Sequence, residues 1–562
     1  MSIIKEYAAA LASLNGEALA TVRGDAAMLA TWQRDGENIG LVWAALREAG
    51  HDETTIADLQ RAVKRAVPPW WAEYEPDEAG QSDAFLQRYG ADWAYITGWE
   101  RWHKWQGACW QSDETRAFRL ALGVMLDDVH REAMELAREL FREAEATARD
   151  LGEKDQAAQD AKQEAKEAFA RAMGWRRTDR RLNAIDNLCK DQRAQHPDKL
   201  SAKNLLNLAN GTLDLDSGAL RPHDRADLLT HCLSYSYDPA ATCPRWLQFL
   251  GEVLVKEDGR TPDPELAALF QEFIGYALTI ETRYEAMLWL SGVGANGKTT
   301  AIKIVNALLG PLALSLDLGA LGRPDASYYL AKLGGARVVF STEATKGQNT
   351  GEDILKRLAS GEPIPARPIR GEPITIQPVA KVLWAMNDKP NVKDTSDGFW
   401  RRLRLVPFYR QFGEHERDTQ LAERLLGELP GILNWALEGL RRLRSNGRFT
   451  DAAAVRDAVE EYRTEQNDVA LWLHERTTMG LPKALRPTDA RTRGRMAFDD
   501  YMSWAKDINR QKTMTETAFG KELKKLAKWE KTTHVEYSFG LLTDNAAGDL
   551  ADGDDILALT GL

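Results

Sequence analysis

The chain has 562 residues, 44% of them hydrophobic and 28% charged, which is the composition of an ordinary globular protein with about three or four domains. Its formal net charge of −11 excludes a surface coated with positive charge for duplex DNA, although a local basic stripe in a ring or groove is compatible with it. The four cysteines include no Cys-x-x-Cys pair, which argues against a zinc ribbon and a disulfide framework. Neither an apolar run of about 18 residues nor a signal-peptide pattern occurs, so we expect a cytoplasmic protein without membrane contact.

The first 200 residues are predicted to be mainly helical. Residues 1–68 are rich in Ala and Leu at helical spacing and receive no functional assignment. Residues 69–200 combine a tryptophan-rich stretch with long helices, and a hairpin is expected around Gln106-Gly107. We interpret its tryptophans as the core of a small sheet, with stacking on nucleic-acid bases as the less favoured alternative.

The rest of the chain changes character several times. Short strands and turns come first, then a strand–loop–helix unit with further strands, and then more helices. The expected segments are a small α+β domain at 201–264, an α/β core at 265–410, a helical lid region at 411–480, a winged helix at 490–542 and an acidic tail at 543–562.

The winged helix is predicted from two helical patterns followed by extended residues. The second helix carries Lys521, Lys524 and Lys525, which would suit contacts to the phosphates of DNA. A lysine-rich solvent face is an equally weighted alternative for these three residues.

Residues 292–299 read Gly-Val-Gly-Ala-Asn-Gly-Lys-Thr and fit the phosphate-binding pattern G-x-x-x-x-G-K-[ST] at every fixed position. An apolar run of strand type precedes them and a helical pattern follows. The glycines let backbone N–H groups surround a polyphosphate, and the helix N-terminus adds positive potential. We expect Lys298 to reach the β- and γ-phosphates and Thr299 to ligate Mg²⁺. The predicted ATP-binding residues are Gly292, Val293, Gly294, Ala295, Asn296, Gly297, Lys298, Thr299 and Thr300.

Two strands downstream of this loop end on polar residues. The first ends on Glu343, a carboxylate that could orient or deprotonate an attacking water. Because Thr342 stands where an aspartate is usual, the contact of Glu343 with a metal is expected to run through water. The second strand ends on Asn387, whose amide could hold the γ-phosphate or the attacking water without adding negative charge.

An arginine pair follows these strands. Arg401 and Arg402 come directly after Trp400, and one of them is expected to enter the site of a neighbouring subunit as an arginine finger. On an extended chain the two side chains would lie on opposite sides, so only one could point into that site. The residues themselves leave open which one.

The order of these elements resembles superfamily 3 helicases, and more narrowly the helicase part of the phage and plasmid primase family, which is related to the poxvirus primase–helicases. The resemblance covers roughly residues 80–475. Its strongest motifs are Leu-Ala-Ser-Gly-Glu-Pro-Ile at 358–364, Ala-Met-Asn-Asp-Lys-Pro at 385–390 and Asp-Gly-Phe-Trp-Arg-Arg-Leu-Arg at 397–404. Upstream, Asn-Gly-Thr-Leu-Asp-Leu at 210–215 is similar to the domain that precedes the ATPase in that family.

The resemblance implies an AAA+-like P-loop ATPase core with a mostly α-helical N-terminal region and a C-terminal winged helix. It also implies a homo-hexameric ring that hydrolyses ATP with Mg²⁺ between subunits and moves 3′→5′ on single-stranded DNA at a fork. A hairpin at 366–374 would line the pore with Arg367 and Arg370. A replication-initiation or primase protein is the partner expected for this role. If a phage encodes the chain, its expected location is the bacterial cytoplasm.

The family pattern fails at the N-terminus. Many relatives carry a primase module there, with paired aspartates on a strand, and residues 1–90 show no such strand. We therefore expect a helicase without primase activity. A bifunctional primase–helicase and an AAA+-like nucleotide switch that does not unwind DNA are the alternatives.

Overall fold

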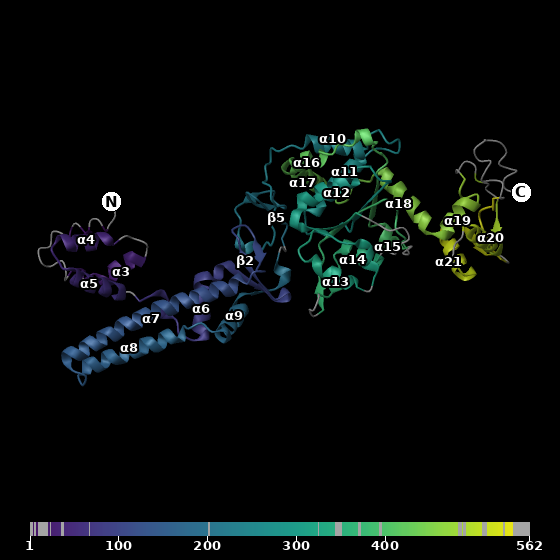
Figure 1. Cartoon of the computed structure of the whole chain (residues 1–562). Coiled ribbons are helices and arrows are strands. Elements are labelled where there is room, and N and C mark those ends of the chain that lie inside the picture. Colours follow the sequence, from purple (N-terminus) through teal and green to yellow (C-terminus); the bar gives the residue numbers. More distant parts are fainter. Residues whose placement is uncertain are drawn as a thin grey trace. The chain divides into compact units, whose positions relative to one another are not determined.

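A computed structural model of the chain shows two compact units, 1–104 with 112–195 and 105–111 with 196–562 (Figure 1). No helix among the described residues is long and apolar enough to cross a bilayer. The structure describes residues 4, 7, 8, 10, 21, 22, 24–34, 39–66, 68–200, 203–323, 325–342, 351–368, 373–392, 396–481, 486, 490–508, 514–531 and 534–542.

The first unit is mainly helical, as its composition predicts. Its small strands form a sheet in which β1 pairs antiparallel with β2 and parallel with β4. The helices are α3 (Ala26–Arg34), α4 (Gly40–Glu48), α5 (Glu53–Ala66), α6 (Glu78–Tyr89), α7 (Ala117–Leu151), α8 (Gln156–Gly174) and α9 (Asp179–Arg193). The strands of this sheet are β1 (Trp93–Ile96), β2 (Arg101–Trp105), β4 (Ala194–Gln195) and β3 (Trp110–Ser112), whose first two residues fall within the segment 105–111 of the second unit.

The predicted hairpin is present, with β2 and β3 on either side of its turn. The turn contains Gly107, whose φ of +83° is the left-handed region that glycine adopts most readily. Trp93 and Trp102 are buried, and the ring of Trp102 stacks on Phe118 with 3.7 Å between centroids. These two tryptophans therefore belong to the core of the small sheet, as the favoured interpretation predicts, whereas Trp99 and Trp105 of the same stretch are half-buried.

The second unit is built on a five-stranded parallel sheet with the order β14-β8-β13-β10-β9. Side chains alternate along β8, so that Leu288 and Leu290 join one buried cluster and Met287 and Trp289 join another on the opposite face. The strands are β8 (Met287–Ser291), β9 (Ala313–Ser315), β10 (Val338–Ser341), β13 (Lys381–Met386) and β14 (Leu403–Pro407).

Helices cover both faces of this sheet (Figure 1). One buried cluster draws on α10 (Pro244–Val253), α11 (Pro264–Ala277), α12 (Lys298–Leu309), α16 (Leu421–Leu426) and α17 (Leu429–Asn446). The other draws on α13 (Ala326–Leu330), α14 (Glu352–Ser360), α15 (Asp397–Trp400) and α18 (Ala453–Gln466). The chain is thus a mixed α/β protein whose central sheet is parallel.

Smaller elements flank the sheet within the second unit. An antiparallel sheet of β5 (Leu205–Leu208), β6 (Gly211–Asp214) and β7 (Leu220–Arg221) precedes α10. After α18 come α19 (Asp468–Arg476), β15 (Thr492–Arg493), α20 (Gly494–Asp507), α21 (Glu516–Leu526), β16 (Trp529–Lys531) and β17 (Val535–Tyr537). The two helices and the extended residues expected after 490 are therefore present. The acidic tail lies outside the described residues.

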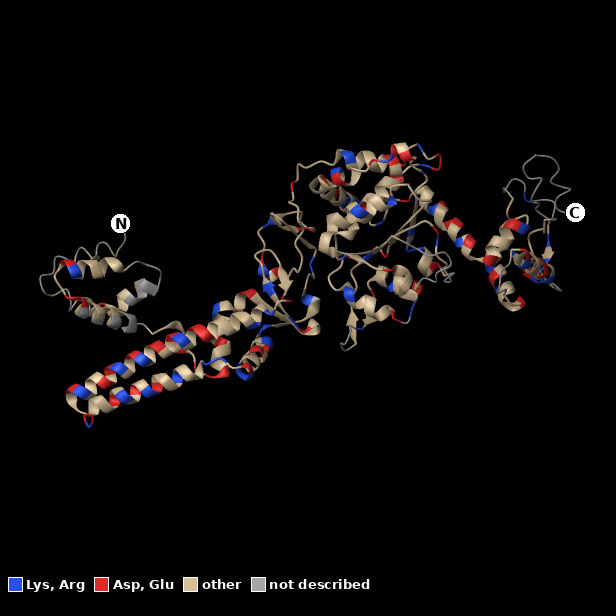
Figure 2. Ribbon diagram, in the orientation of Figure 1, with Lys and Arg blue, Asp and Glu red and all other residues tan. Residues whose placement is uncertain are grey.

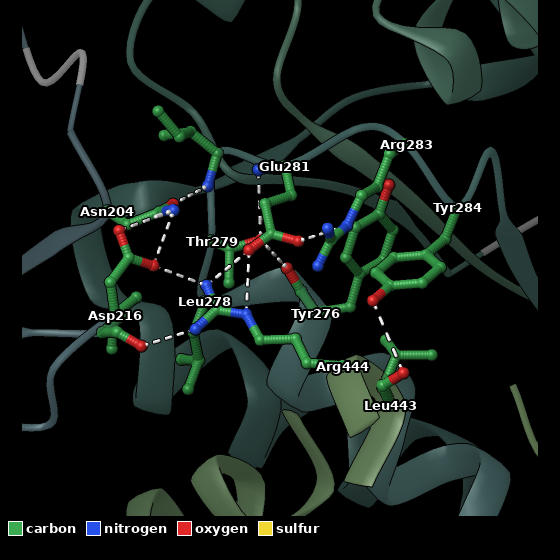
Figure 3. A network of polar contacts seen from close by, with 12 residues as sticks. Asn204, Asp216, Tyr276, Leu278, Thr279, Glu281, Arg283, Tyr284, Leu443 and Arg444 are labelled. Carbon is green, nitrogen blue, oxygen red and sulfur yellow. Dashed lines mark hydrogen bonds and ion pairs between the residues drawn. The ribbon is translucent and has the colours of Figure 1, made fainter. Parts of the chain in front are cut away.

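Arg444 of α17 connects three parts of this unit (Figure 3). Its Nη1 donates to the carbonyl of Leu215 at 2.7 Å, and its Nη2 donates to Asp216 Oδ1 at the same distance. Its Nε donates to Glu281 Oε1, 2.9 Å away in the segment after α11. The small β5–β7 sheet is therefore attached to the ends of α11 and α17.

The packing of α11 against α17 predicts that a methyl group added at this contact destabilises the protein. A Cβ on Gly439 would overlap the backbone carbonyl of Gln271, so Gly439→Ala should lower the free energy of unfolding by about 1–3 kcal/mol. The matched control is Gly251→Ala in α10, where no heavy atom lies within 4 Å of the added Cβ. This second change should leave the melting temperature unchanged or raise it, because alanine favours a helix by up to about 1 kcal/mol. Equal melting temperatures for the two variants would contradict the close α11–α17 contact.

Candidate functional site

The glycine-rich segment joins the end of β8 to the start of α12, as its pattern predicts. Gly292, Ala295 and Gly297 all have positive φ, of 154°, 57° and 87°. A Cβ on Gly297 would lie 2.7 Å from a methyl carbon of Val253, so only glycine lets α10 pack this closely on the loop. The loop is therefore shaped by its own turns and by the neighbouring helix.

Lys298 is the first residue of α12, and its side chain folds back into the loop. Its Nζ donates to the Gly292 carbonyl at 2.6 Å and to Asn296 Oδ1 at 2.9 Å. Only 5% of the residue is exposed, and this burial lowers the pKa of Lys298 to about 8. An ammonium with three donors and two neutral acceptors is well placed to interact with an anion at the loop.

The other predicted residues of the loop differ in exposure. Thr299 is exposed in the first turn of α12, and Thr300 is half-buried beside it. Val293 forms an exposed apolar tip, whereas Asn296 is buried and serves as a partner of Lys298. The sequence pattern treats both of these as free positions, so it does not indicate the role of Asn296.

Asn387 lies at the same edge of the sheet as the loop. It directly follows β13, whose last residue, Met386, pairs with Ser291 at the end of β8. Since the carboxyl ends of parallel strands meet at one edge, the exposed Asn387 is close to the start of the loop. Glu343 lies outside the described residues; β10 ends two positions before it, at Ser341, opposite Trp384 of β13.

A cleft of about 450 Å³ opens beside the loop. Its walls include Phe249 of α10 on one side and Phe412 on the other, and Phe412 N donates to the Ala295 carbonyl at 2.8 Å. Charged side chains also line it, namely Arg245, Glu252, Glu416, Arg417 and Asp418. Sequence reasoning missed this cleft, because its walls come from segments on both sides of the loop in the chain and neither carries a recognisable motif.

The two arginines of the predicted pair have different environments. Residues 401–402 form a turn after α15, so the expectation of an extended chain with side chains on opposite sides is wrong; both guanidinium groups contact the same oxygen of Glu285. The Arg402 side chain is 9% exposed and contacts Glu285 at 2.7 Å and Ser360 Oγ at 2.9 Å. The Arg401 side chain is 64% exposed, with one contact to Glu285 at 3.3 Å.

This turn lies at the amino edge of the sheet. The Met287 N–H at the start of β8 donates to the Arg402 carbonyl at 2.8 Å, whereas the glycine-rich loop leaves the other end of β8. At about 3.3 Å per residue, the length of β8 separates the arginine turn from the glycine-rich loop by roughly 15 Å. The structure therefore does not bring the arginine pair together with Lys298 and Asn387 within one chain.

The predicted hairpin is formed by β11 (Ile364–Ala366) and β12 (Ile374–Ile376), which pair antiparallel with Ala366 opposite Ile374. Arg367 is exposed at the first position after β11. Arg370 lies outside the described residues.

A second cleft, of about 850 Å³, lies between α21 and the strands that follow it. Lys521, Lys524 and Lys525 all line it and are exposed, and Lys524 Nζ lies 4.6 Å from the centroid of the Trp529 ring. Further lining residues are Arg493, Arg495, Glu516 and His534. We name this cleft the basic groove. Its cations make it suited to a polyanion, and the Trp529 side chain adds an aromatic surface at its margin.

Comparisons with known proteins match the same parts of the chain. The model of the family described as D5 N terminal like matches residues 82–255, and that of a family of unknown function, DUF5906, matches residues 290–402. "Putative helicase L207/L206" of Acanthamoeba polyphaga mimivirus is 26% identical over 278 residues, which are 46% of this chain and 29% of that protein. "Putative helicase 121R" of Invertebrate iridescent virus 3 is 23% identical over 310 residues, 48% of this chain and 32% of that protein.

The match spans about a third of the length of these curated relatives. Among solved structures, the apo C-terminal region of NrS-1 covers 56% of this chain and 80% of its own, with 12% identity and a TM-score of 0.37. Together the family and relative matches confirm the resemblance to phage and viral primase–helicases that the sequence motifs indicate.

The lowered pKa of Lys298 predicts a pH dependence of stability. In the folded protein Lys298 loses its proton near pH 8, whereas in the unfolded chain it does so near pH 10.5. The unfolded state therefore binds more protons between these values, and the contribution of Lys298 to stability rises with pH across this window. Urea unfolding without nucleotide should be measured for the wild type and for Lys298→Met. The difference between their free energies of unfolding should move in favour of the wild type from about pH 8 to pH 10. Lys303→Met provides the control, since it removes an exposed lysine of the same helix that does not enter the loop. A difference for Lys298→Met that stays constant with pH would contradict the buried ammonium.

Proposed function

We propose that this chain, which resembles phage and viral primase–helicases, is an ATP-dependent DNA helicase of superfamily 3. The observation that carries the proposal is the strand–loop–helix arrangement in which the buried ammonium of Lys298 lies within a glycine-rich loop at the carboxyl edge of a parallel sheet. A polyphosphate in this loop would replace the Gly292 carbonyl and Asn296 amide as partners of the ammonium. The negative charge of the polyphosphate would also favour the charged form of Lys298, which burial disfavours.

The neighbouring residues supply the other groups that phosphoryl transfer requires. Asn387, directly after β13, is proposed to hold the γ-phosphate or the attacking water, and Glu343 is proposed to orient or deprotonate that water. The exposed hydroxyl of Thr299 offers an oxygen ligand of the kind that Mg²⁺ prefers, with Glu343 contacting the ion through water. Mg²⁺ would neutralise charge on the phosphates.

The cleft beside the loop supports a nucleotide rather than a free phosphate. It adjoins Ala295, Gly297 and Thr300 of the loop, so a nucleoside attached to a bound phosphate chain would reach it. The half-buried ring of Phe412 offers apolar surface for a base, and the charged side chains of the rim offer hydrogen-bonding groups for a ribose.

The separation of the arginine pair from the loop favours a site shared between two subunits. Arg402 is buried, and both of its terminal nitrogens contact neighbours in its own chain, so we assign it a structural role. Arg401 is exposed and lies about the length of one strand from Lys298 of its own chain. Arg401 is therefore our candidate for the arginine finger, acting on ATP bound to the next subunit of a homo-hexameric ring.

Two basic surfaces are proposed to contact DNA. The hairpin between β11 and β12, with Arg367 and Arg370, would line the centre of the ring and grip the single strand during 3′→5′ movement. The basic groove, with Lys521, Lys524 and Lys525, would bind phosphates at the fork. A primase or replication-initiation protein is the kind of partner that such a motor requires.

The first test of this proposal is the loss of the ammonium. Lys298→Ala should reduce the rate of ATP hydrolysis by roughly 10²-fold or more, because it removes the cation that contacts the transferred phosphate. The fold should remain, as judged by circular dichroism and gel filtration. Lys303→Ala, on the exposed face of the same helix, is the matched control and should keep its activity.

The wild type should also hydrolyse ATP faster with single-stranded DNA and should displace the labelled strand of a forked substrate. Hydrolysis that is indifferent to DNA would instead indicate a nucleotide switch. Retained hydrolysis in Lys298→Ala would rule out the loop as the site of chemistry.

The arginine pair provides the second test. Arg401→Ala should lower the hydrolysis rate by roughly 10³-fold while sparing the affinity for an ATP analogue, since an arginine finger acts on the transition state. Arg402→Ala should instead lower the melting temperature, because it leaves Glu285 and Ser360 without a buried partner. Mixing Arg401→Ala with Glu343→Gln should restore part of the activity, because some interfaces then combine an intact Glu343 with an intact Arg401. A mixture as inactive as its components would contradict action between subunits.

A further inference from the structure

A groove in the first unit is enclosed by α7, α8 and the segment 68–72, and it has a volume of about 420 Å³. The segment 68–72 is held in place by hydrogen bonds to both helices. Trp71 Nε1 donates to Glu132 Oε2 of α7 at 2.9 Å, and Arg171 Nη2 of α8 donates to the carbonyls of Ala72 and Tyr74 at 2.6 and 2.5 Å. The third wall of the groove is therefore part of the folded unit.

The floor of the groove is apolar. Ala133, Leu136 and Leu140 line it from α7, at the i, i+3 and i+7 spacing that places side chains on one stripe of a helix. Ala168 contributes from α8, and Pro68 closes one side. A floor of this kind accommodates aliphatic side chains from a ligand.

The rim of the groove is acidic. Glu132, Glu135 and Glu139 follow the neighbouring stripe of α7 with the same spacing, and Glu164 lies on α8. The α7 stripe extends over about 10 Å, at 1.5 Å per residue. The carboxylates of Glu135, Glu139 and Glu164 form no ion pair or hydrogen bond with any described residue.

The charge of the groove differs from that of the helices that form it. Lys and Arg are interspersed with Asp and Glu along α7 and α8 as a whole (Figure 2). Among the described residues, Arg171 is the one basic residue that lines the groove, and its guanidinium is engaged by the two backbone carbonyls. Three carboxylates are thus available to a ligand with no competing cation.

We infer that this groove is a docking site for a basic amphipathic helix of a partner protein. The available carboxylates of Glu135 and Glu139 on α7 and of Glu164 on α8 would pair with Lys or Arg side chains along a helix laid in the groove. Aliphatic residues on the adjacent stripe of that helix would enter the apolar floor. Nucleic acid does not suit the groove, because its phosphates would meet the carboxylates. Every residue of the groove belongs to the first unit, whereas the glycine-rich loop belongs to the second.

The test uses the full-length protein and a fluorescent synthetic peptide of about 18 residues, with Leu on one face of the helix and Lys on its flanks. Fluorescence anisotropy should show saturable binding that weakens as salt rises, since exposed ion pairs are screened. The triple variant Glu135→Lys, Glu139→Lys, Glu164→Lys should bind the peptide at least tenfold more weakly. A peptide with Glu in place of Lys should not bind the wild type.

The matched control reverses three exposed acidic residues of the same helices outside the groove, in the variant Glu145→Lys, Asp150→Lys, Glu167→Lys. It has the same net charge as the groove variant and should bind the peptide within threefold of the wild type. Equal weakening in both variants would show general attraction to an acidic protein and would overturn the inference. Absence of binding to the wild type, or binding that the groove variant retains, would overturn it as well.

Discussion

The second unit depends on two buried cations that meet the C-terminus of α11. Arg337 and Lys381 stand at the starts of the neighbouring strands β10 and β13; Arg337 donates to the Leu278 carbonyl and Lys381 to the Thr279 carbonyl. The last carbonyls of a helix lack partners within the helix and carry partial negative charge, so they stabilise the two buried basic side chains. Burial lowers the pKa of Arg337 to about 9 and that of Lys381 well below its usual value. The adjacent His231 adds no third charge, since burial and then the charge of Arg337 lower its pKa to about 3.

The same contacts position the candidate site at the opposite edge of the sheet. Arg337 also donates to the Leu205 carbonyl at 2.6 Å, so the small β5–β7 sheet, α11 and the central strands are held by one side chain. The register that starts at Lys381 and Val338 determines where β10 and β13 end, and therefore where Asn387 stands relative to the glycine-rich loop. A shift of the strand register by one residue would move buried side chains to the wrong face of the sheet. The contacts of Arg337 and Lys381 and the alternation of side chains along β8 therefore favour the same register.

The sequence allowed the local parts of this arrangement to be predicted, because their signals are short in range. The glycine loop, the hairpin around Gly107 and the pairing of Ala366 with Ile374 are each encoded within about a dozen residues. The parts that could not be predicted depend on contacts between distant segments. Nothing local distinguishes Arg401 from Arg402, because both contact Glu285 and only Arg402 also reaches Ser360, far away in the chain. Likewise, the cleft beside the loop requires Phe249 and Phe412 to converge, and neither position carries a motif.

The net charge of −11 is a poor guide to the partners of this chain, because its charges are sorted into local surfaces. The α7–α8 groove is acidic, whereas the basic groove beside α21 presents lysines on an exposed face. The range of an exposed charge at physiological salt is about 8 Å, which is shorter than either surface. A ligand approaching one groove therefore responds to that groove and not to the total charge. An acidic chain can in this way attract a polyanion at one surface and a basic helix at another, and the selection between them arises from where each residue lies in the fold.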